Sequence, residues 1–405
     1  MQTLHTSPRI RDAALAAAVA VSASALTPHL ASAALEMRTW VGETSTDWNT
    51  NANWSPTSPP LAADRIAVFD RAFTYQPAIK THVTVIAGIW MTGDTVGDVI
   101  ITSSPDGQNS GKPTFQTRGN TINGIDGVGI LMDNTSSGNL TIATSAFKVE
   151  FSQTWINNSA NLFTIAADTN LAGATATITG SGNTLISGNI TNNTGTGRII
   201  KEGTGTLTLA GETISYNGET TVNSGTLLVT GTMSSGSALV TVNGGTLGGT
   251  GTIGRTTTIH EGATLAPGLS SDSAGTLTIN RNLTIEGTAA FDLIGAGEND
   301  KVFVNAVNEG SRTLTFGGTL VVTATDGMTF APGQVFDLFD WGDKTAVTGT
   351  FDSIQLPTLT GGLSWQMFGD QPFDYQTGQI VVVPEPVGGI ALGGLAVLLT
   401  RRRRS

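Results

Sequence analysis

Three aspartates near the C-terminal end are spaced closely enough to suggest metal chemistry. Asp337, Asp340 and Asp343 recur every third residue on a predicted loop, and Asp352 follows shortly after. Carboxylate oxygens are the ligands that Ca²⁺ prefers, so these residues could share a calcium ion. The segment lacks the central glycine and the bidentate glutamate of an EF-hand loop. A solvated acidic surface is therefore the favoured interpretation, and no metal site is predicted, although calcium binding by this loop stays open.

A second acidic group consists of Asp292, Glu298 and Asp300, which Lys301 follows directly. We interpret this stretch as a loop inserted between strands, in which Lys301 supplies the counter-charge. The group does not predict a site.

Residues for nucleophilic or acid–base catalysis are scarce. The chain has no cysteine, and outside the first 33 residues its histidines are His82 and His260. His260 stands where a repeat places polar, outward residues, so a surface position is expected. No catalytic residue, cofactor or enzymatic activity is predicted from these residues.

A repeated 20-residue unit in the middle of the chain indicates the elements that carry the side chains. Gly-Thr-Leu occurs at 205–207, 225–227 and 245–247, and the preceding segment 221–225 has its counterpart at 241–245. Apolar and polar residues alternate within each copy, which indicates short strands, and glycines between them permit sharp corners.

One such unit cannot bury its own apolar face, but stacked units can. The sequence therefore predicts an all-β fold, a right-handed parallel β-helix or solenoid, with Asn223 stacked on Asn243 in a ladder. An antiparallel sandwich is the competing fold, and the sparse hairpin turns in the repeats disfavour it.

Residues 201–227 resemble the autotransporter-associated β-strand repeat over its whole length, and 265–279 resembles the stretch that often follows such repeats. The resemblance implies the parallel β-helix of secreted passenger domains. A passenger that drives its own secretion would need a terminal membrane barrel of many alternating strands, and we expect a different export route for this chain.

We divide the remainder by composition. Residues 34–63 carry Trp40, Trp48 and Trp54 and are predicted to form an N-terminal cap, with sugar stacking by these rings as the lesser alternative. Residues 64–325 are expected to form the β-helix, clearest over 201–285, and 326–383 an aromatic-rich C-terminal β cap.

The N-terminus has the pattern of a secretory signal peptide over residues 1–33. A basic start and an Ala-rich apolar stretch, expected to be a signal helix, precede Ala31-Ser32-Ala33, and signal peptidase would cut after Ala33.

The C-terminus, 384–405, combines Pro384-Glu385-Pro386, an apolar run over 387–399 and four arginines, Arg401, Arg402, Arg403 and Arg404. This pattern resembles the PEP-CTERM sorting signal of Gram-negative bacteria. The resemblance implies a hydrophobic transmembrane helix that anchors the chain transiently, and processing by an exosortase at the cell surface. Whether the tail is removed or retained stays open.

The net charge of the chain bears on whether nucleic acid is a partner. The chain has 20 basic and 31 acidic residues, and without the two arginines and one aspartate of 1–33 and the four terminal arginines the net charge is −16. Such acidity disfavours nucleic acid.

We therefore expect an exported cell-surface, outer-membrane or extracellular-matrix protein that is structural or adhesive. Its expected partners are exopolysaccharide or other surface proteins, in a biofilm. The alternative is a carbohydrate-active β-helix enzyme, a polysaccharide lyase or glycosidase, which needs paired acids in a groove.

Overall fold

The computed structural model of the protein describes residues 35–80, 83–94, 97–104, 113–234, 236–305 and 312–386. The predicted signal helix with Ala31 and Ala33, His82, the C-terminal apolar run and the four terminal arginines lie outside these residues. Within the described part, no helix is long and apolar enough to cross a membrane.

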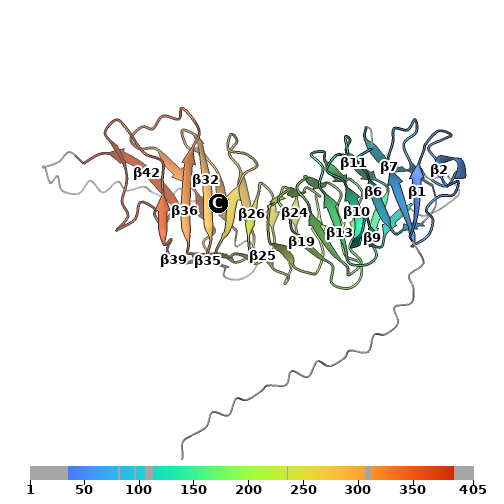
Figure 1. Cartoon of the computed structure of the whole chain (residues 1–405). Helices are drawn as coiled ribbons and strands as arrows, with labels where there is room; N and C mark the ends of the chain where they lie inside the picture. Colours follow the sequence, from blue (N-terminus) through green and yellow to red (C-terminus); the bar gives the residue numbers. More distant parts are fainter. Residues whose placement is uncertain are drawn as a thin grey trace, which may run out of the picture. The chain divides into compact units, whose positions relative to one another are not determined.

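Most of the described residues form three long sheets, in which successive coils pair in parallel and only the short strands β2 (Trp54–Ser55), β9 (Asn120–Ile122) and β33 (Glu298–Asn299) pair antiparallel. Figure 1 shows the coils following one another in sequence order, from the blue strands to the red ones. The chain thus visits the first, second and third sheet in turn, which is the arrangement of a parallel β-helix. The all-β, parallel fold expected from the repeats is confirmed.

The first sheet contains 15 strands: β1 (Glu36–Trp40), β2 (Trp54–Ser55), β3 (Arg65–Phe69), β6 (Gly88–Met91), β9 (Asn120–Ile122), β10 (Ile125–Met132), β13 (Gln153–Asn157), β16 (Thr175–Thr179), β19 (Arg198–Lys201), β22 (Thr220–Val222), β25 (Val240–Val242), β28 (Thr257–Ile259), β31 (Leu283–Ile285), β35 (Arg312–Phe316) and β39 (Thr345–Gly349).

The second sheet contains 13 strands: β4 (Ala78–Ile79), β7 (Val99–Ser103), β11 (Leu140–Ala143), β14 (Phe163–Ile165), β17 (Thr184–Ile186), β20 (Thr206–Leu209), β23 (Thr226–Val229), β26 (Gly245–Gly249), β29 (Ala263–Pro267), β32 (Thr288–Gly295), β33 (Glu298–Asn299), β36 (Thr319–Ala324) and β40 (Ser353–Gln355).

The third sheet contains 11 strands: β5 (Val83–Ile86), β8 (Thr114–Thr117), β12 (Ala146–Val149), β15 (Thr169–Asn170), β18 (Ile190–Thr191), β21 (Ile214–Ser215), β24 (Thr232–Met233), β27 (Thr252–Ile253), β30 (Thr276–Ile279), β34 (Lys301–Val304) and β38 (Phe339–Trp341). A short 3-10 helix, η1 (Asn51–Asn53), and a separate antiparallel sheet of β37 (Val335–Asp337), β42 (Gln379–Pro384) and β41 (Leu363–Trp365) complete the fold.

Identical side chains stack from coil to coil inside the helix. Leu207 of β20 pairs with Leu227, which pairs with Leu247 and then with Leu265, and all four are fully buried. Threonines alternate with them and point outward, as the two-residue period of a strand requires. The interior is therefore built from columns of aliphatic side chains that run across the coils.

A polar ladder runs along one outer corner of the same coils. Asn243 Nδ2 donates to Asn223 Oδ1 at 2.9 Å, and Asn223 Nδ2 donates to Glu202 Oε1 at 2.6 Å. The predicted stacking of Asn223 and Asn243 is confirmed, and the ladder extends by one coil to Glu202.

The tryptophans near the N-terminus lie inside the first coils. Trp40, Trp48 and Trp54 have exposures of 0%, 0% and 1%, and their rings pack against one another. Sugar stacking requires an open ring face, which these buried side chains do not offer. The two-residue strand β2 pairs antiparallel with β1 and covers its outer edge, the edge at which another strand could otherwise add.

The parallel sheets continue past residue 325, where a separate cap was expected to begin. β38, β39 and β40 extend the third, first and second sheets, while β37, β41 and β42 form the antiparallel sheet. Aromatic rings close the interior here, namely those of Phe316, Phe339, Phe351, Phe373 and Tyr375.

Candidate functional site

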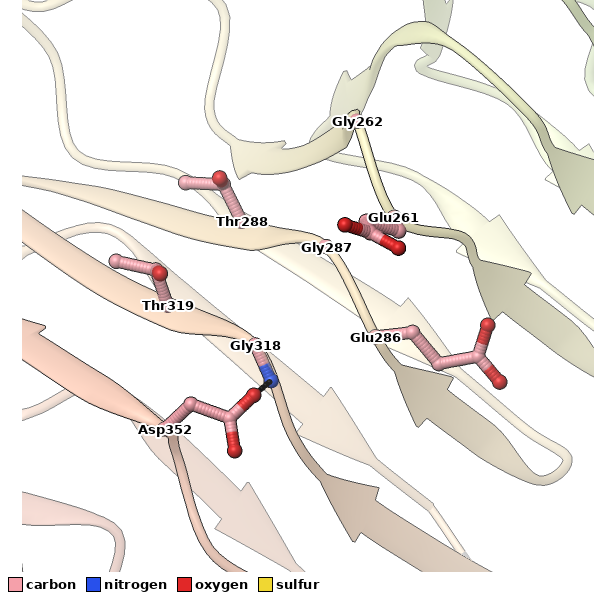
Figure 2. A pocket seen from close by; sticks show the side chains of 8 residues that line it. All are labelled: Glu261, Gly262, Glu286, Gly287, Thr288, Gly318, Thr319 and Asp352. Carbon is pink, nitrogen blue, oxygen red and sulfur yellow. Dashed lines mark hydrogen bonds between the residues drawn. The ribbon is translucent and has the colours of Figure 1, made fainter.

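A groove of about 560 Å³ crosses four successive corners between the first and second sheets, and we call it the corner groove. Figure 2 shows its lining, which consists of Glu261, Gly262, Glu286, Gly287, Thr288, Gly318, Thr319 and Asp352. These residues follow β28, β31, β35 and β39 in the chain, so each coil contributes one turn to the groove.

Glycines shape the floor of the corner groove because the turns approach one another closely. A Cβ atom on Gly287 would lie 2.3 Å from the Ala263 carbonyl oxygen, and one on Gly318 would lie 2.0 Å from the Gly287 carbonyl oxygen. Gly318 also has a φ of +60°, which other residues rarely adopt. The floor is therefore bare backbone, and the side chains that could act on a ligand stand at its sides.

Three carboxylates line the corner groove in different surroundings. Glu286 Oε2 lies 2.8 Å from His260 Nδ1, and Asp352 Oδ2 accepts a hydrogen bond of 3.0 Å from the Gly318 N–H. Glu261 is exposed, and its side chain has no hydrogen-bond or ion-pair partner among the described residues. In Figure 2, Asp352 turns toward the Gly318 backbone and Glu286 extends away from it.

The chemistry of this arrangement is mainly hydrogen bonding. Carboxylates, backbone groups and the Thr288 and Thr319 hydroxyls can bind the hydroxyl groups of a polyol. Over the described residues, no group of three or more acids and histidines is placed to hold a metal ion. His260 has a side chain that is 42% exposed and stands at an outer corner, as its repeat position predicted.

The predicted aspartate loop is not assembled around one point. Asp337 forms a salt bridge of 2.6 Å with Lys301, Asp340 accepts a hydrogen bond from the Trp341 N–H, and Asp352 belongs to the corner groove. Burial raises the pKa of Asp337. Lys301, expected as counter-charge for Asp292, Glu298 and Asp300, instead pairs with Asp337, because β34 lies beside β38 and carries Lys301 to the end of β37.

Asp300 is not on an exposed loop surface. Its exposure is 2%, and its Oδ1 accepts a hydrogen bond of 2.8 Å from the Gly275 N–H. Burial is the main cause that raises the pKa of Asp300 to about 6. The short hairpin of β32 and β33 that precedes it matches the predicted insertion.

Two buried cations lie in the repeat region and were not predicted. Lys201 and Arg255 are each 1% exposed. Lys201 occupies the interior column of Ile178 and Val222, whereas the 20-residue period of the sequence aligns it with the outward Thr221. Burial lowers its pKa to about 8. Its Nζ donates to the carbonyl oxygens of Gly203 and Ser224 at 3.0 and 3.3 Å, and also to that of Glu202.

The proposed sorting motif begins at the end of a strand. β42 ends at Pro384, and the Glu385 N–H donates to the Gly362 carbonyl at 2.7 Å. Pro384, Glu385 and Pro386 are all exposed. The antiparallel sheet thus leads directly into the motif.

Comparison with known proteins supports the repeat. The profile of the family described as passenger-associated-transport-repeat matches residues 199–229, which span β19 to β23. No curated protein matches the chain. Over residues 199–229 the chain is similar to the repeats of exported passenger proteins, and these repeats lie within its parallel β-helix.

Proposed function

We propose that the protein is an exported β-helix protein of the bacterial cell surface or extracellular matrix, with a structural or adhesive role. The observation that carries the proposal is the passenger-associated repeat over residues 199–229, placed on coils that repeat the same columns and ladder. We infer a right-handed helix, because connections between parallel strands of one sheet wind that way in about 98% of cases.

The surface of the repeats supports binding rather than chemistry. The Glu202, Asn223 and Asn243 ladder presents amide and carboxylate groups at a spacing of one coil, roughly 4.8 Å. Such a row can hydrogen-bond to successive units of a long polymer. An exopolysaccharide of a biofilm matrix is the partner that we propose, with other surface proteins as the alternative.

The adhesive function is tested with the full chain and exopolysaccharide extracted from a biofilm. We expect the protein to sediment with the polymer and to release no new reducing ends or unsaturated sugars. Replacement of Asn223 and Asn243 by Ala should weaken cosedimentation, whereas Asn193→Ala, at an exposed turn of another corner, should not. Polymer cleavage by the wild-type chain would refute the structural role.

The corner groove supports a second candidate, a carbohydrate-active enzyme. Glu261, Glu286 and Asp352 are carboxylates, the side chains that serve as acid and as base or nucleophile in glycoside hydrolysis. If the chain cleaves a polysaccharide, Glu261→Gln and Asp352→Asn should each lower the rate at least tenfold, while Asp272→Asn, outside the groove, should not. Equal rates in all variants would exclude the groove as the active site.

For export we propose cleavage by signal peptidase after Ala33 and sorting by an exosortase at Pro384-Glu385-Pro386. In a host with the exosortase, mass spectrometry of the surface protein should find a C-terminus near Pro386. Without the enzyme, or with Glu385→Ala, the chain should keep its tail and stay in the membrane fraction. An unchanged C-terminus in both hosts would refute the sorting step.

A further inference from the structure

A small cavity lies at the corner between the third and first sheets in the repeat region. Its volume is about 130 Å³, and we call it the cation cavity because Arg255 forms part of its wall. The lining comes from three successive coils, at the end of β21 and after β21, β24 and β27, and consists of Ser215, Tyr216, Asn217, Ser234, Gly236, Ser237, Ala238 and Arg255. Tyr216 and Arg255 are buried, and Ser215, Asn217 and Ser237 are exposed, so the cavity has a polar rim and a buried wall.

The guanidinium of Arg255 is fixed by its neighbours but not neutralised by them. Nη1 donates to the Gly218 carbonyl oxygen at 2.9 Å, and Nη2 donates to that of Tyr216. The guanidinium carbon lies 4.2 Å from the centroid of the Tyr216 ring. Nε is buried and has no hydrogen-bond partner.

No carboxylate of the described residues forms a salt bridge with Arg255. An arginine cannot lose its proton in a protein, so burial leaves a full positive charge in this wall. The phenol of Tyr216 does not supply a negative charge either, because burial raises its pKa. A buried charge is costly unless an opposite charge or enough hydrogen bonds accompany it.

Lys201 shows how the same fold satisfies a buried cation internally. Its Nζ has three donors and contacts three backbone carbonyls, those of Glu202, Gly203 and Ser224. Arg255 has five donors, and protein carbonyls accept from two of its nitrogens. Arg255 also borders a cavity rimmed by serine hydroxyls, which can donate hydrogen bonds to an anion.

We propose that the cation cavity is a binding site for one small oxyanion, with the buried Arg255 charge as the attraction and the hydroxyls of Ser215, Ser234 and Ser237 as the donors. With a volume of about 130 Å³, the cavity has room for a carboxylate, sulfate or phosphate group. The group can belong to a free inorganic ion or to an acidic sugar whose ring stays outside the rim. This inference does not depend on the adhesive function, since it uses only the charge and geometry of the cavity.

The test is isothermal titration of the full chain with sodium sulfate, sodium glucuronate and glucose at constant ionic strength. We expect saturable 1:1 binding of an oxyanion and none of glucose. Binding of both anions identifies the oxyanion group itself as the ligand, and binding of glucuronate alone identifies a sugar carboxylate. No saturable binding of either anion, or equal binding of glucose, would overturn the proposal.

Variants assign the binding to this cavity. Ser234→Ala combined with Ser237→Ala changes the rim without touching the core and should weaken binding at least tenfold. Ser181→Ala, an exposed serine of another corner, should leave the affinity unchanged. Arg255→Met should abolish binding, and circular dichroism shows whether that variant folds. Unchanged affinity in the double serine variant would place the anion elsewhere and refute the assignment.

Discussion

Between β19 and β28 the interior columns hold mainly aliphatic side chains of similar size, whereas from β35 onward a cluster of aromatic rings packs in the interior beside the aliphatic side chains. Leu227 and Leu247 each rest between a leucine of the coil before and a leucine of the coil after. Phe316 instead touches four rings, those of Phe339, Phe351, Phe373 and Tyr375. A coil in the middle of the stack has neighbours on both sides, but the last coil has one, so larger side chains must cover its open face.

The largest loss of stability is therefore expected at the closed end. Phe316→Ala removes the ring at the centre of the aromatic cluster and should lower the free energy of unfolding by about 4 kcal/mol. Urea unfolding of the full chain measures the loss. Phe151→Ala, at a ring that is 55% exposed, should change the free energy by less than about 0.5 kcal/mol.

Truncation of a buried side chain in the columns of the repeats should lower the free energy of unfolding somewhat less. Leu227→Ala leaves a cavity between two leucines and should lower the free energy of unfolding by about 3 kcal/mol in the same measurement. Leu228→Ala is the matched control, because this neighbouring leucine of β23 points outward and is only partly buried. If Leu227→Ala lowered the free energy of unfolding more than Phe316→Ala does, the aromatic end would not be more sensitive than the repeat coils.

The buried carboxylate of Asp300 predicts a pH dependence that the aliphatic coils lack. Folding raises the pKa of this acid from 3.8 to about 6, so the folded chain binds the proton more tightly than the unfolded chain does. The contribution of Asp300 to stability is thus fully present below pH ~4 and is lost as the pH rises through about 6, a change of about 1 to 3 kcal/mol.

Thermal unfolding between pH 4 and pH 7 measures this effect. Asp300→Asn should remove the dependence and leave the variant relatively more stable than the wild type near pH 7. Asp272→Asn, an exposed aspartate, should keep the wild-type profile. Identical profiles for the wild type and Asp300→Asn would show that the carboxylate does not titrate in this range.

The outer ladder of Glu202, Asn223 and Asn243 should contribute least to the stability of the fold. Asn243→Ala removes one exposed hydrogen bond to Asn223 and should lower the free energy of unfolding by about 0.5 to 1 kcal/mol. Asn193→Ala, an exposed asparagine of another corner, should cost nothing measurable. A loss of more than 2 kcal/mol would mean that the coils depend on their polar surface as much as on their columns.

The repeats allowed the regular coils to be predicted because equal spacing fixes the register. Asn223 and Asn243 are 20 residues apart and hydrogen-bonded, so the period in the sequence is the period of the fold. Beyond Ile259 the coils lengthen, and the contacts His260–Glu286 and Gly318–Asp352 span 26 and 34 residues. With no constant period, the sequence could not show that Glu261, Glu286 and Asp352 border one groove.

The cations were harder to predict for a different reason. Lys201 stands in an aliphatic column, but the 20-residue period aligns it with the outward Thr221, and its true partner Val222 lies 21 residues on. Arg255 stands in a corner, where a charged residue is expected to be solvated. Only the packing of three coils around it shows that it is buried.

The corners of the coil differ in how much extra chain they can accept. At the corner with Gly287 and Gly318, backbones of adjacent coils approach so closely that even a methyl group has no room. The extra residues of the later coils are placed mostly between the second and third sheets, as in the β32–β33 hairpin. An epitope inserted at Gly297, in the turn of this hairpin, would be displayed without disturbing the stack, while the same peptide after Gly318 would separate two coils. The fold thus combines one corner at which the distance between coils is fixed with another corner at which inserted sequence can be displayed.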